Sequence, residues 1–326
     1  MAPCTPRGTG RLRPAALFFM YLFNIYEIFL VSYIIIAAIG AVILIKRRSK
    51  TLAIILIISI LGLIYSACVE PYWVKIRYQT VVVNKLEQPL RVAVVGDWHI
   101  RPGKGADFIK KSIQKIADLK PDLILMTGDF LFFDEIEKFD KDLASLGELS
   151  KIAPTFTVLG NHDYGIVFPD DSFLYADSHQ EIAKILTDNG VKVLSDEQER
   201  VKIKGIELDL VGFDEYWLKS RDPEKAMAGL VKDNILKIGL SHHPDIAFDA
   251  IAANLDLVVA GHTHGGQIRL PLIGALGGAQ SSLPRKDYGR YLADLRPRLF
   301  NTVGIGESGP PLRFLDRPEI ALLEIK

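Results

Sequence analysis

The sequence has no excess of charge of either sign, because its 326 residues contain 39 Lys plus Arg and 39 Asp plus Glu. Nucleic-acid-binding proteins usually carry a basic surplus that neutralises phosphates, so we expect no nucleic-acid partner. Only two cysteines are present, Cys4 and Cys68, which excludes a disulfide framework and a cysteine-rich metal site. The chain after residue 74 also has no low-complexity linker and no internal repeat. Collagen-like, disulfide-rich and disordered classes are therefore excluded.

Charge is almost missing from two long segments near the N-terminus. Residues 17–45 contain one charged residue, Glu27, and residues 52–69 contain none. Each segment can supply the roughly 20 apolar residues that cross a hydrocarbon core. We predict a transmembrane helical hairpin over residues 17–73, with a short basic loop at 46–50, and the alternative is a pair of buried core helices. A basic segment of residues 1–16 precedes it, and one domain of residues 74–326 follows.

The charges around the hairpin give conflicting signals about its orientation. The loop between the two spans carries four cations in five residues, which favours a cytoplasmic loop and an extracytoplasmic domain. Cations before the first span and after the second favour the opposite orientation. They are Arg7, Arg11, Arg13, Lys75 and Arg77. We predict a multi-pass protein of the cell (inner) membrane with an extracytoplasmic domain.

The domain alternates short β-rich runs with amphipathic segments, which predicts an α/β architecture with helices on the sheet faces. Several runs are continuously apolar, as in strands that are buried on both faces. The predicted strands are residues 80–84, 90–95, 123–127, 156–159, 191–194, 208–211, 236–240, 255–260 and 320–325. The predicted helices are residues 106–119, 135–150, 179–189, 223–231 and 246–253.

Five of these strands lead directly into clusters of small residues, carboxylates and histidines. The carboxyl ends of strands in open α/β sheets face the ligand crevice, so these side chains should converge. Imidazole and carboxylate together suit zinc, iron or manganese. In an extended chain, Asp-x-His and His-x-His place both side chains on one side. The clusters are Gly96-Asp97-Trp98-His99, Gly128-Asp129, Gly160-Asn161-His162-Asp163, Ser241-His242-His243 and Gly261-His262-Thr263-His264.

Each cluster taken alone has an ordinary explanation. Gly-Asp and Gly-Asn-His-Asp can be simple turns, and His-His-Pro can be a solvated loop. Trp98 lies between two candidate ligands, and we expect it to pack in the core rather than contact substrate. The occurrence of all five clusters, each just after a strand, favours a metal site.

The order of these clusters resembles the calcineurin-like metallophosphoesterase superfamily. The family pattern is Asp-x-His, Gly-Asp, Gly-Asn-His-Asp/Glu, His and Gly-His-x-His, and all five blocks occur between Asp97 and His264. The C-terminal residues 304–320 resemble the membrane-associated bacterial branch, whose relatives include pyrophosphatases of UDP-2,3-diacylglucosamine. The resemblance implies a β-sandwich of mixed sheets flanked by helices in four layers.

The resemblance also implies a site with two divalent metal ions, either Mn, Fe, Zn or a mixed pair. A hydroxide that bridges them would be the nucleophile. The first ion would be held by Asp97, His99 and His264. The second would be held by Asn161, His242 and His262, and Asp129 would bridge both. His162 would be the acid that protonates the leaving oxygen.

The sequence departs from the family pattern near the catalytic histidine. Relatives often carry an acid three positions after the bridging aspartate, where this chain has Phe132. Asp134 or Asp163 could orient His162 instead. His243 could cap its loop or contact substrate, so Asp163 and His243 are candidates for supporting roles behind the ligands.

We therefore predict a membrane-anchored phosphodiesterase or pyrophosphatase, with a lipid-linked phosphate as one candidate substrate. The aromatic-rich residues 164–175 could form a lid over an acyl chain or pack on the core. Three arginines, Arg269, Arg285 and Arg290, could hold phosphate or the bilayer surface. The alternatives are a soluble-nucleotide phosphodiesterase that is merely tethered to the membrane and a non-catalytic scaffold of the same fold.

Overall fold

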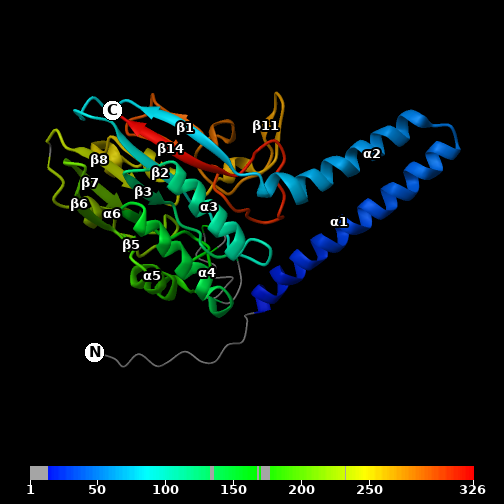
Figure 1. The fold of residues 1–326 in the computed structure, drawn as a ribbon, viewed down its shortest axis with the longest axis horizontal. Coiled ribbons are helices and arrows are strands. Elements are labelled where there is room, and N and C mark those ends of the chain that lie inside the picture. The colour runs from blue at the N-terminus through cyan, green and yellow to red at the C-terminus, as the bar shows by residue number, and fades with distance from the viewer. Residues whose placement is uncertain (1–13, 133–135, 167–168, 170–176, 232) are drawn as a thin grey trace.

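Two mixed β-sheets pack face to face, helices cover their outer faces, and a helical hairpin projects to one side (Figure 1). The computed structural model describes residues 14–132, 136–166, 169, 177–231 and 233–326, and for residues 14–27 it describes the backbone alone. This architecture confirms the predicted α/β sandwich in four layers that follows a helical hairpin.

The hairpin consists of α1 (Pro14–Lys46) and α2 (Lys50–Ile64), joined by the predicted basic loop. The second span ends in a π-turn, η1 (Tyr65–Val69), and a 3-10 turn, η2 (Glu70–Tyr72), rather than continuing as an α-helix. Within the described residues, 28–46 and 50–72 are long and apolar enough to cross a membrane.

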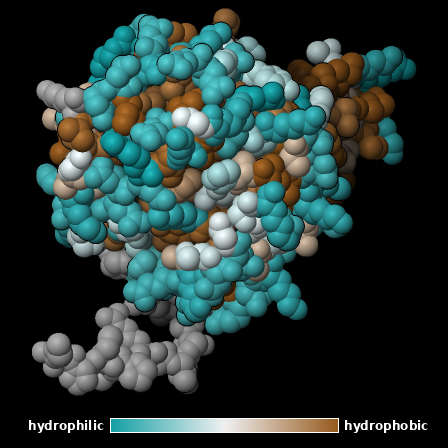
Figure 2. Space-filling model, turned by 60° about the vertical axis from the view of Figure 1, so that its left-hand side comes forward, coloured by the Kyte–Doolittle hydropathy of each residue, from teal (hydrophilic) through white to brown (hydrophobic). Residues whose placement is uncertain are grey.

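The side chains of these helices do not form a protein core. Ile36 is 69% exposed and Ile58 is 62% exposed, and few of the described hairpin side chains are buried. The alternative of two buried core helices is therefore wrong. Figure 2 shows the apolar surface gathered on the hairpin, whereas the visible face of the domain is mostly hydrophilic. The hairpin is thus compatible with membrane anchoring.

The first sheet has the strand order β1-β14-β2-β3-β4-β5. Strand β14 is antiparallel to β2 and parallel to β1, while β2, β3, β4 and β5 run parallel to one another. The carboxyl ends of those four strands therefore meet at one edge. The strands are β1 (Lys75–Val81), β2 (Leu90–Val95), β3 (Leu123–Met126), β4 (Thr155–Thr157), β5 (Lys192–Val193) and β14 (Glu319–Ile325).

The second sheet has the order β12-β13-β9-β8-β7-β6, in which β13, β9, β8 and β7 are parallel. A separate ribbon of β10 (Arg269–Leu270) and β11 (Gly274–Ala275) follows β9. The strands of the sheet are β6 (Glu197–Ile203), β7 (Ile206–Gly212), β8 (Leu236–Leu240), β9 (Leu257–Ala260), β12 (Tyr291–Leu292) and β13 (Arg298–Asn301). We did not predict β6, which is polar and lies at the sheet edge, or the short β10 to β13.

Side chains alternate between the two faces of each strand, so the apolar core has three layers. Val92 and Val94 of β2 face the interior between the sheets, whereas Ala93 and Val95 pack against helices outside. The outer face of the first sheet is covered by α3 (Ala106–Asp118), α4 (Asp140–Ser145) and α5 (His179–Asp188). The second sheet is covered by α6 (Pro223–Met227) and by the 3-10 turns η5 (Pro244–Phe248) and η6 (Ala250–Asn254).

Three predicted helices differ from the structure. The helix predicted at 246–253 is wrong, because Asp249 is extended and separates the two 3-10 turns. The helix predicted at 223–231 ends at Met227, since Ala228 is extended and Gly229 has a φ of 85°. The helix predicted at 135–150 is divided into η3 (Ile136–Lys138), α4 and η4 (Leu146–Lys151), and residue 135 lies outside the described residues.

One buried carboxylate fixes the hairpin to the domain. Glu70 is fully buried, and its two oxygens accept the backbone N–H groups of Leu315, at 2.9 Å, and Asp316. The N–H of Arg313 also donates to the carbonyl of Ser66 at 3.0 Å. The end of the second span is therefore held against the loop that precedes β14.

Replacing Glu70 by Ala should loosen this junction. Two N–H groups would lose a charged acceptor, which typically costs about 1.5–3 kcal/mol. We expect a lower free energy of unfolding in detergent and faster proteolysis between residues 66 and 73. Glu87→Ala removes an exposed carboxylate and is the control. Equal behaviour of the two variants would show that Glu70 does not hold the junction.

Candidate metal centre

Both sheets contribute to one polar cluster at the carboxyl ends of their parallel strands. The clusters after β2, β3 and β4 come from the first sheet, and those after β8 and β9 come from the second. Two hydrogen bonds join the loops of the first sheet directly to those of the second. The N–H of His262 donates to Asp97 Oδ1 at 2.8 Å, and His242 Nδ1 lies 2.7 Å from the carbonyl oxygen of Thr127.

One half of the cluster contains two carboxylates and two imidazoles, and all four side chains are buried. His99 Nε2 lies 3.1 Å from His264 Nε2 and 3.3 Å from Asp129 Oδ2. His264 Nε2 lies 3.7 Å from Asp97 Oδ1. Two ligand atoms that share an ion at about 2.1 Å lie about 3.0–3.5 Å apart, so this group can hold one metal ion.

The other half contains an amide and two imidazoles. Asn161 Oδ1 lies 3.1 Å from both His242 Nε2 and His262 Nδ1, and those two nitrogens are also 3.1 Å apart. Asp129 Oδ2 lies 3.2 Å from His242 Nε2. The same oxygen of Asp129 therefore contacts an imidazole in each half, which is the arrangement expected of a bridging ligand.

Backbone carbonyls set the tautomers of the two histidines in the second half. A carbonyl can only accept, so His242 donates through Nδ1 to Thr127. His262 donates through Nε2 to the carbonyl of Gln280 at 3.0 Å. The remaining nitrogen of each ring faces the cluster. At His262 it presents a lone pair, because the pKa of that ring is lowered. Although burial acts in the opposite direction, the nearby Asp129 raises the pKa of His242 to about 10, so a metal ion would displace a proton from His242 Nε2.

The electrostatics of the cluster fit a cation. Asp97 Oδ2 is buried and has no hydrogen-bond partner within the residues that the structure describes. Burial lowers the pKa values of His262 and His264 well below the usual range, so both rings are neutral at pH 7. Facing nitrogen lone pairs and a buried carboxylate repel one another unless positive charge lies among them. The donor set of N and O atoms suits divalent transition metals.

Five of the predicted ligands have a left-handed backbone. The φ angles are 49° for Asp97, 41° for His99, 55° for Asp129, 67° for His262 and 51° for His264. The expectation that Asp-x-His and His-x-His are extended is therefore wrong, although their side chains do converge. Residues other than glycine adopt positive φ rarely, and such strain gathers at functional sites. The surrounding fold holds these side chains in place at a cost in backbone energy.

Two glycines are required by the close approach of loops to the carboxylates. A Cβ atom on Gly160 would lie 2.2 Å from Asp129 Oδ1. A Cβ atom on Gly304 would lie 2.6 Å from Asp97 Cβ, and Gly304 also has a φ of 70°. Any larger residue at either position would displace a predicted ligand.

His162 lies beside the cluster and is oriented by a backbone group. Its N–H donates to Asp129 Oδ1 at 2.9 Å, and its Nδ1 lies 2.9 Å from the carbonyl oxygen of Phe132. The carbonyl of Phe132 therefore contacts the ring where relatives carry an acid, and Asp134 lies outside the described residues. The other ring nitrogen, Nε2, lies 3.5 Å from Ser308 Oγ. Burial lowers the pKa of His162 to about 4, although Asp129 acts in the opposite direction.

Asp163 braces the loops that carry the ligands. Its carboxylate accepts the backbone N–H groups of Asp129 at 3.1 Å, Phe130 at 2.8 Å and Gly160 at 2.9 Å. Burial and the nearby Asp129 raise the pKa of Asp163 to about 7, against the effect of those N–H groups. Asp163 therefore supports the predicted ligands through hydrogen bonds to the backbone of their loops.

His243 stands behind the second half of the cluster. Its Nε2 lies 2.9 Å from Glu215 Oε1, and its ring lies 3.6 Å from the ring of His262. Glu215 is fully buried and was not predicted. The ligand-type atoms of His242, His243 and His262 lie within 4.8 Å of one another, and His243 Nε2 is paired with Glu215.

The other residues singled out in the sequence lie around the cluster. Trp98 is buried in the core, as expected. Arg269 donates to the carbonyls of Gly265 and Tyr288, and so it supports the turn after His264. Arg285 and Arg290 contact Leu276 and Asp287. Of the predicted lid, residues 167–168 and 170–175 lie outside the described residues, and the lid stays a prediction.

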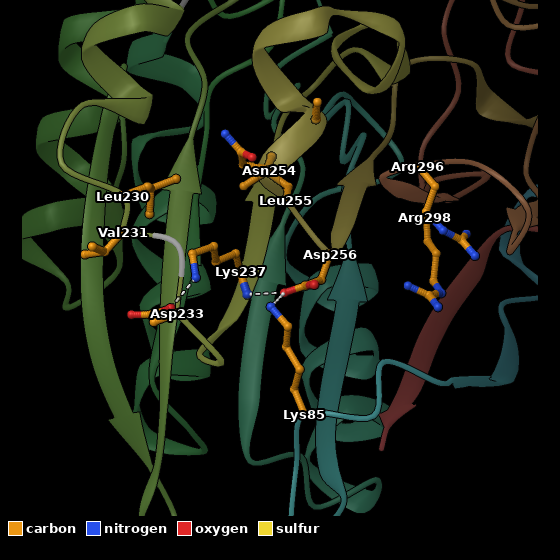
Figure 3. Close-up of a pocket in the computed structure, with 11 residues that line it drawn as sticks. Lys85, Leu230, Val231, Asp233, Lys237, Asn254, Leu255, Asp256, Arg296 and Arg298 are labelled. Carbon is orange, nitrogen blue, oxygen red and sulfur yellow. Dashed lines mark hydrogen bonds and ion pairs between the residues drawn. The ribbon is translucent and has the colours of Figure 1, made fainter.

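A further cavity lies at the opposite ends of the strands of the second sheet (Figure 3). Its volume is about 570 Å³, and Lys85 and Lys237 extend into it. Each amine is paired with a carboxylate, Lys85 Nζ with Asp256 at 2.8 Å and Lys237 Nζ with Asp233 at 2.5 Å. Arg296 and Arg298 also line this cavity, which holds no group of His, Asp or Glu side chains that could bind a metal ion within the described residues.

The two-sheet sandwich and its shared cluster of N and O ligands define a metallophosphoesterase. The family model described as Calcineurin-like phosphoesterase matches residues 90–266, more than half of the chain. The chain belongs to this family, whose members hydrolyse phosphoric esters.

Named relatives agree with this class. The chain is 29% identical to the protein named Phosphodiesterase YaeI of Escherichia coli (strain K12), over 81% of this chain and 93% of that protein. It is 25% identical to the uncharacterized metallophosphoesterase YkuE of Bacillus subtilis (strain 168), over 80% of this chain and 89% of that protein. It is 26% identical to the UDP-2,3-diacylglucosamine pyrophosphatase LpxG of Chlamydia muridarum (strain MoPn / Nigg), over 72% of this chain and 83% of that protein. These names support a hydrolase.

Replacing His264 by Ala should remove a metal ion. The substitution takes away one of two facing imidazoles in the first half of the cluster and leaves the second half intact. We expect the metal content of the purified protein to fall from about two ions per chain to about one. Elemental analysis after equilibration with Mn²⁺ measures this. His179→Ala changes a histidine that neither belongs to the cluster nor supports it and that pairs with Asp177, and an equal loss in that variant would contradict the assignment.

Proposed function

We propose that this chain is a membrane-anchored phosphoesterase that hydrolyses a phosphodiester or pyrophosphate bond with two divalent metal ions. The observation that carries the proposal is the position of Asp129, whose Oδ2 lies within 3.3 Å of imidazoles from both halves of the cluster. All seven predicted ligands are present, and this argues against the non-catalytic scaffold.

In the proposed mechanism, Asp97, His99 and His264 hold one ion and Asn161, His242 and His262 hold the other. When bound, such ions supply Lewis-acid polarisation of the phosphate and a water of lowered pKa. Asp129 would be shared by both sites, since its Oδ2 lies 3.3 Å from His99 Nε2 and 3.2 Å from His242 Nε2.

His162 is the proposed proton donor to the leaving oxygen. Its Nδ1–H is held by the carbonyl of Phe132, so Nε2 is the atom that carries the transferred proton. An anionic phosphate beside the ring would raise its low pKa, because an opposite charge favours the imidazolium. The substrate would thus help to protonate its own acid.

A cavity next to the cluster can receive the group attached to the phosphate. It has a volume of about 340 Å³ and is lined by His264 and Ser308, together with Ile268, Pro310 and Leu312. Ser308 also lies beside His162 Nε2, so this cavity adjoins the proposed proton donor. Its aliphatic walls suit an apolar substituent better than a charged one.

Membrane anchoring is the second part of the proposal. The exposed apolar hairpin and its attachment through Glu70 would hold the domain close to a bilayer. The basic loop at 46–50 favours an extracytoplasmic domain, whereas Lys75 and Arg77 after the second span favour the opposite orientation. The relative named as a pyrophosphatase of a diacylated sugar nucleotide favours a lipid-linked substrate. The relative named as a phosphodiesterase leaves a soluble diester as the second candidate.

Replacing His162 by Ala should separate chemistry from metal binding. A positioned acid contributes about 10²–10⁴-fold, so turnover of an unactivated phosphodiester should fall by that factor. Metal content should not change, because the ring is not a predicted ligand. Full turnover in this variant, or loss of metal, would rule out the assigned role. His179→Ala again serves as the control.

A substrate panel should define the bond that is cleaved. We expect Mn²⁺-dependent hydrolysis of UDP-2,3-diacylglucosamine in vesicles to exceed that of an aryl phosphodiester, and an aryl monoester to be the poorest of the three. Phosphate release and product mass measure the outcome. Preference for the soluble aryl diester would favour the tethered phosphodiesterase, and no hydrolysis with any metal would overturn the proposed activity.

A further inference from the structure

The ribbon of β10 and β11 presents two large aliphatic side chains to solvent. In the loop that joins the strands, residues 271–273, Leu272 is fully exposed and Ile273 is 68% exposed. Leu272 has a φ of 70°, which is rare for a bulky residue, so the backbone is held in an uncommon conformation that keeps this side chain outward. We call residues 271–273 the ribbon tip.

The base of the ribbon is joined to the root of the hairpin. The N–H of Arg269 donates to the carbonyl of Phe314 at 2.9 Å. The ring of Phe314 meets that of Tyr65, at the end of the second span, with centroids 6.5 Å apart. In Figure 1 the orange loop beside the β11 label stands at the edge of the domain from which α2 leaves. The tip is therefore on the side of the domain that faces the hairpin.

Cations and an aromatic ring lie near this side. Arg285 and Lys286 belong to the turn η8 (Arg285–Asp287), which packs against β11, and Arg285 donates to the carbonyl of Leu276 at 3.4 Å. At the hairpin root, the guanidinium of Arg317 lies 3.9 Å from the centre of the Trp73 ring, and Trp73 is 53% exposed. Basic and aromatic side chains around apolar ones are typical of the membrane interface.

We propose that the ribbon tip is a second membrane contact, which inserts Leu272 and Ile273 into the leaflet at the root of the hairpin. The partner is the surface of a lipid bilayer. This inference rests on the proposed membrane anchoring, since the hairpin brings the tip to the bilayer. Anionic headgroups would pair with Arg285 and Lys286.

The contact would place the active-site cavity at the membrane surface. Ile268, which precedes β10, and Gly277, which follows β11, both line the cavity beside His264. The base of the ribbon therefore borders the cavity, and the far end of the same ribbon is the tip. A substrate anchored in the leaflet could then present its phosphate to the metal cluster without leaving the bilayer.

A fluorescent probe on the full chain tests the insertion. Cys4→Ser and Cys68→Ser remove both native cysteines. Leu272→Cys, or Ile273→Cys as a second site, is then labelled with an environment-sensitive nitrobenzoxadiazole probe. The protein is reconstituted in vesicles of phosphatidylcholine and phosphatidylglycerol, with and without nitroxide-labelled lipids. Turnover of a soluble aryl phosphodiester shows that each labelled protein is folded.

Val231→Cys is the matched control. Val231 is also an exposed aliphatic residue, at 58%, but it lines the cavity at the opposite ends of the strands (Figure 3). We expect nitroxide lipids to quench the probe at 272 by about twofold or more and to leave the probe at 231 unchanged.

Three other outcomes contradict the inference and remain distinguishable. If the protein floats with vesicles but the probe at 272 is not quenched, the second contact is absent while the anchoring holds. A blue shift at 272 without lipid quenching would mean that the tip packs against another copy of the chain. If the full chain does not float with vesicles, the proposed anchoring fails as well.

Discussion

The carboxylate of Asp129 lies between imidazoles that come from two different sheets, and the rest of the domain holds that meeting point in place. His99 follows a strand of the first sheet and His242 follows a strand of the second, yet both contact the same oxygen. A buried, charged carboxylate is costly unless positive charge or donors surround it. The parallel strands of both sheets end at this edge, so the ligands can converge only if the two sheets pack in one register.

Strain and close packing at the site are balanced by the rigid sandwich beneath it. Several predicted ligands have a positive φ, which costs energy at each position. The carboxylate of Asp163 opposes that cost by accepting three backbone N–H groups from the loops around it. The backbone carbonyls of Thr127 and Gln280 fix the orientation of two imidazoles. Most of the support for the cluster therefore comes from the backbone, which keeps the ligand atoms close together in a dry environment.

The hairpin, the loop at 312–317 and the β10–β11 ribbon form a connected set on one side of the domain. Glu70 attaches the hairpin to that loop, and Phe314 of the loop bonds to the ribbon. Arg313, which is fully buried, donates from its guanidinium to the carbonyls of Val303 and Gly306, close to Asp97. The segments that would meet a bilayer are thus linked through a few hydrogen bonds to the segments around the metal cluster. If the proposed anchoring holds, position in the membrane and access to the site are properties of the same part of the fold.

The sequence by itself determined the class of the fold, the apolar hairpin and the polar clusters that follow the strands, because apolar periodicity and polar clusters after strands are local patterns. The assignment of single residues as metal ligands came from the family resemblance and stays a prediction. The sequence did not reveal Glu215, Ser308 or Glu70, or the carbonyl that orients His162. Those residues act through partners far along the chain, such as Ser308 and His162, which are 146 residues apart. Every residue has a carbonyl, so no residue type marks the one that accepts from the ring of His162. The tertiary structure alone decided these contacts, since only packing of the two sheets brings the distant loops within hydrogen-bonding distance.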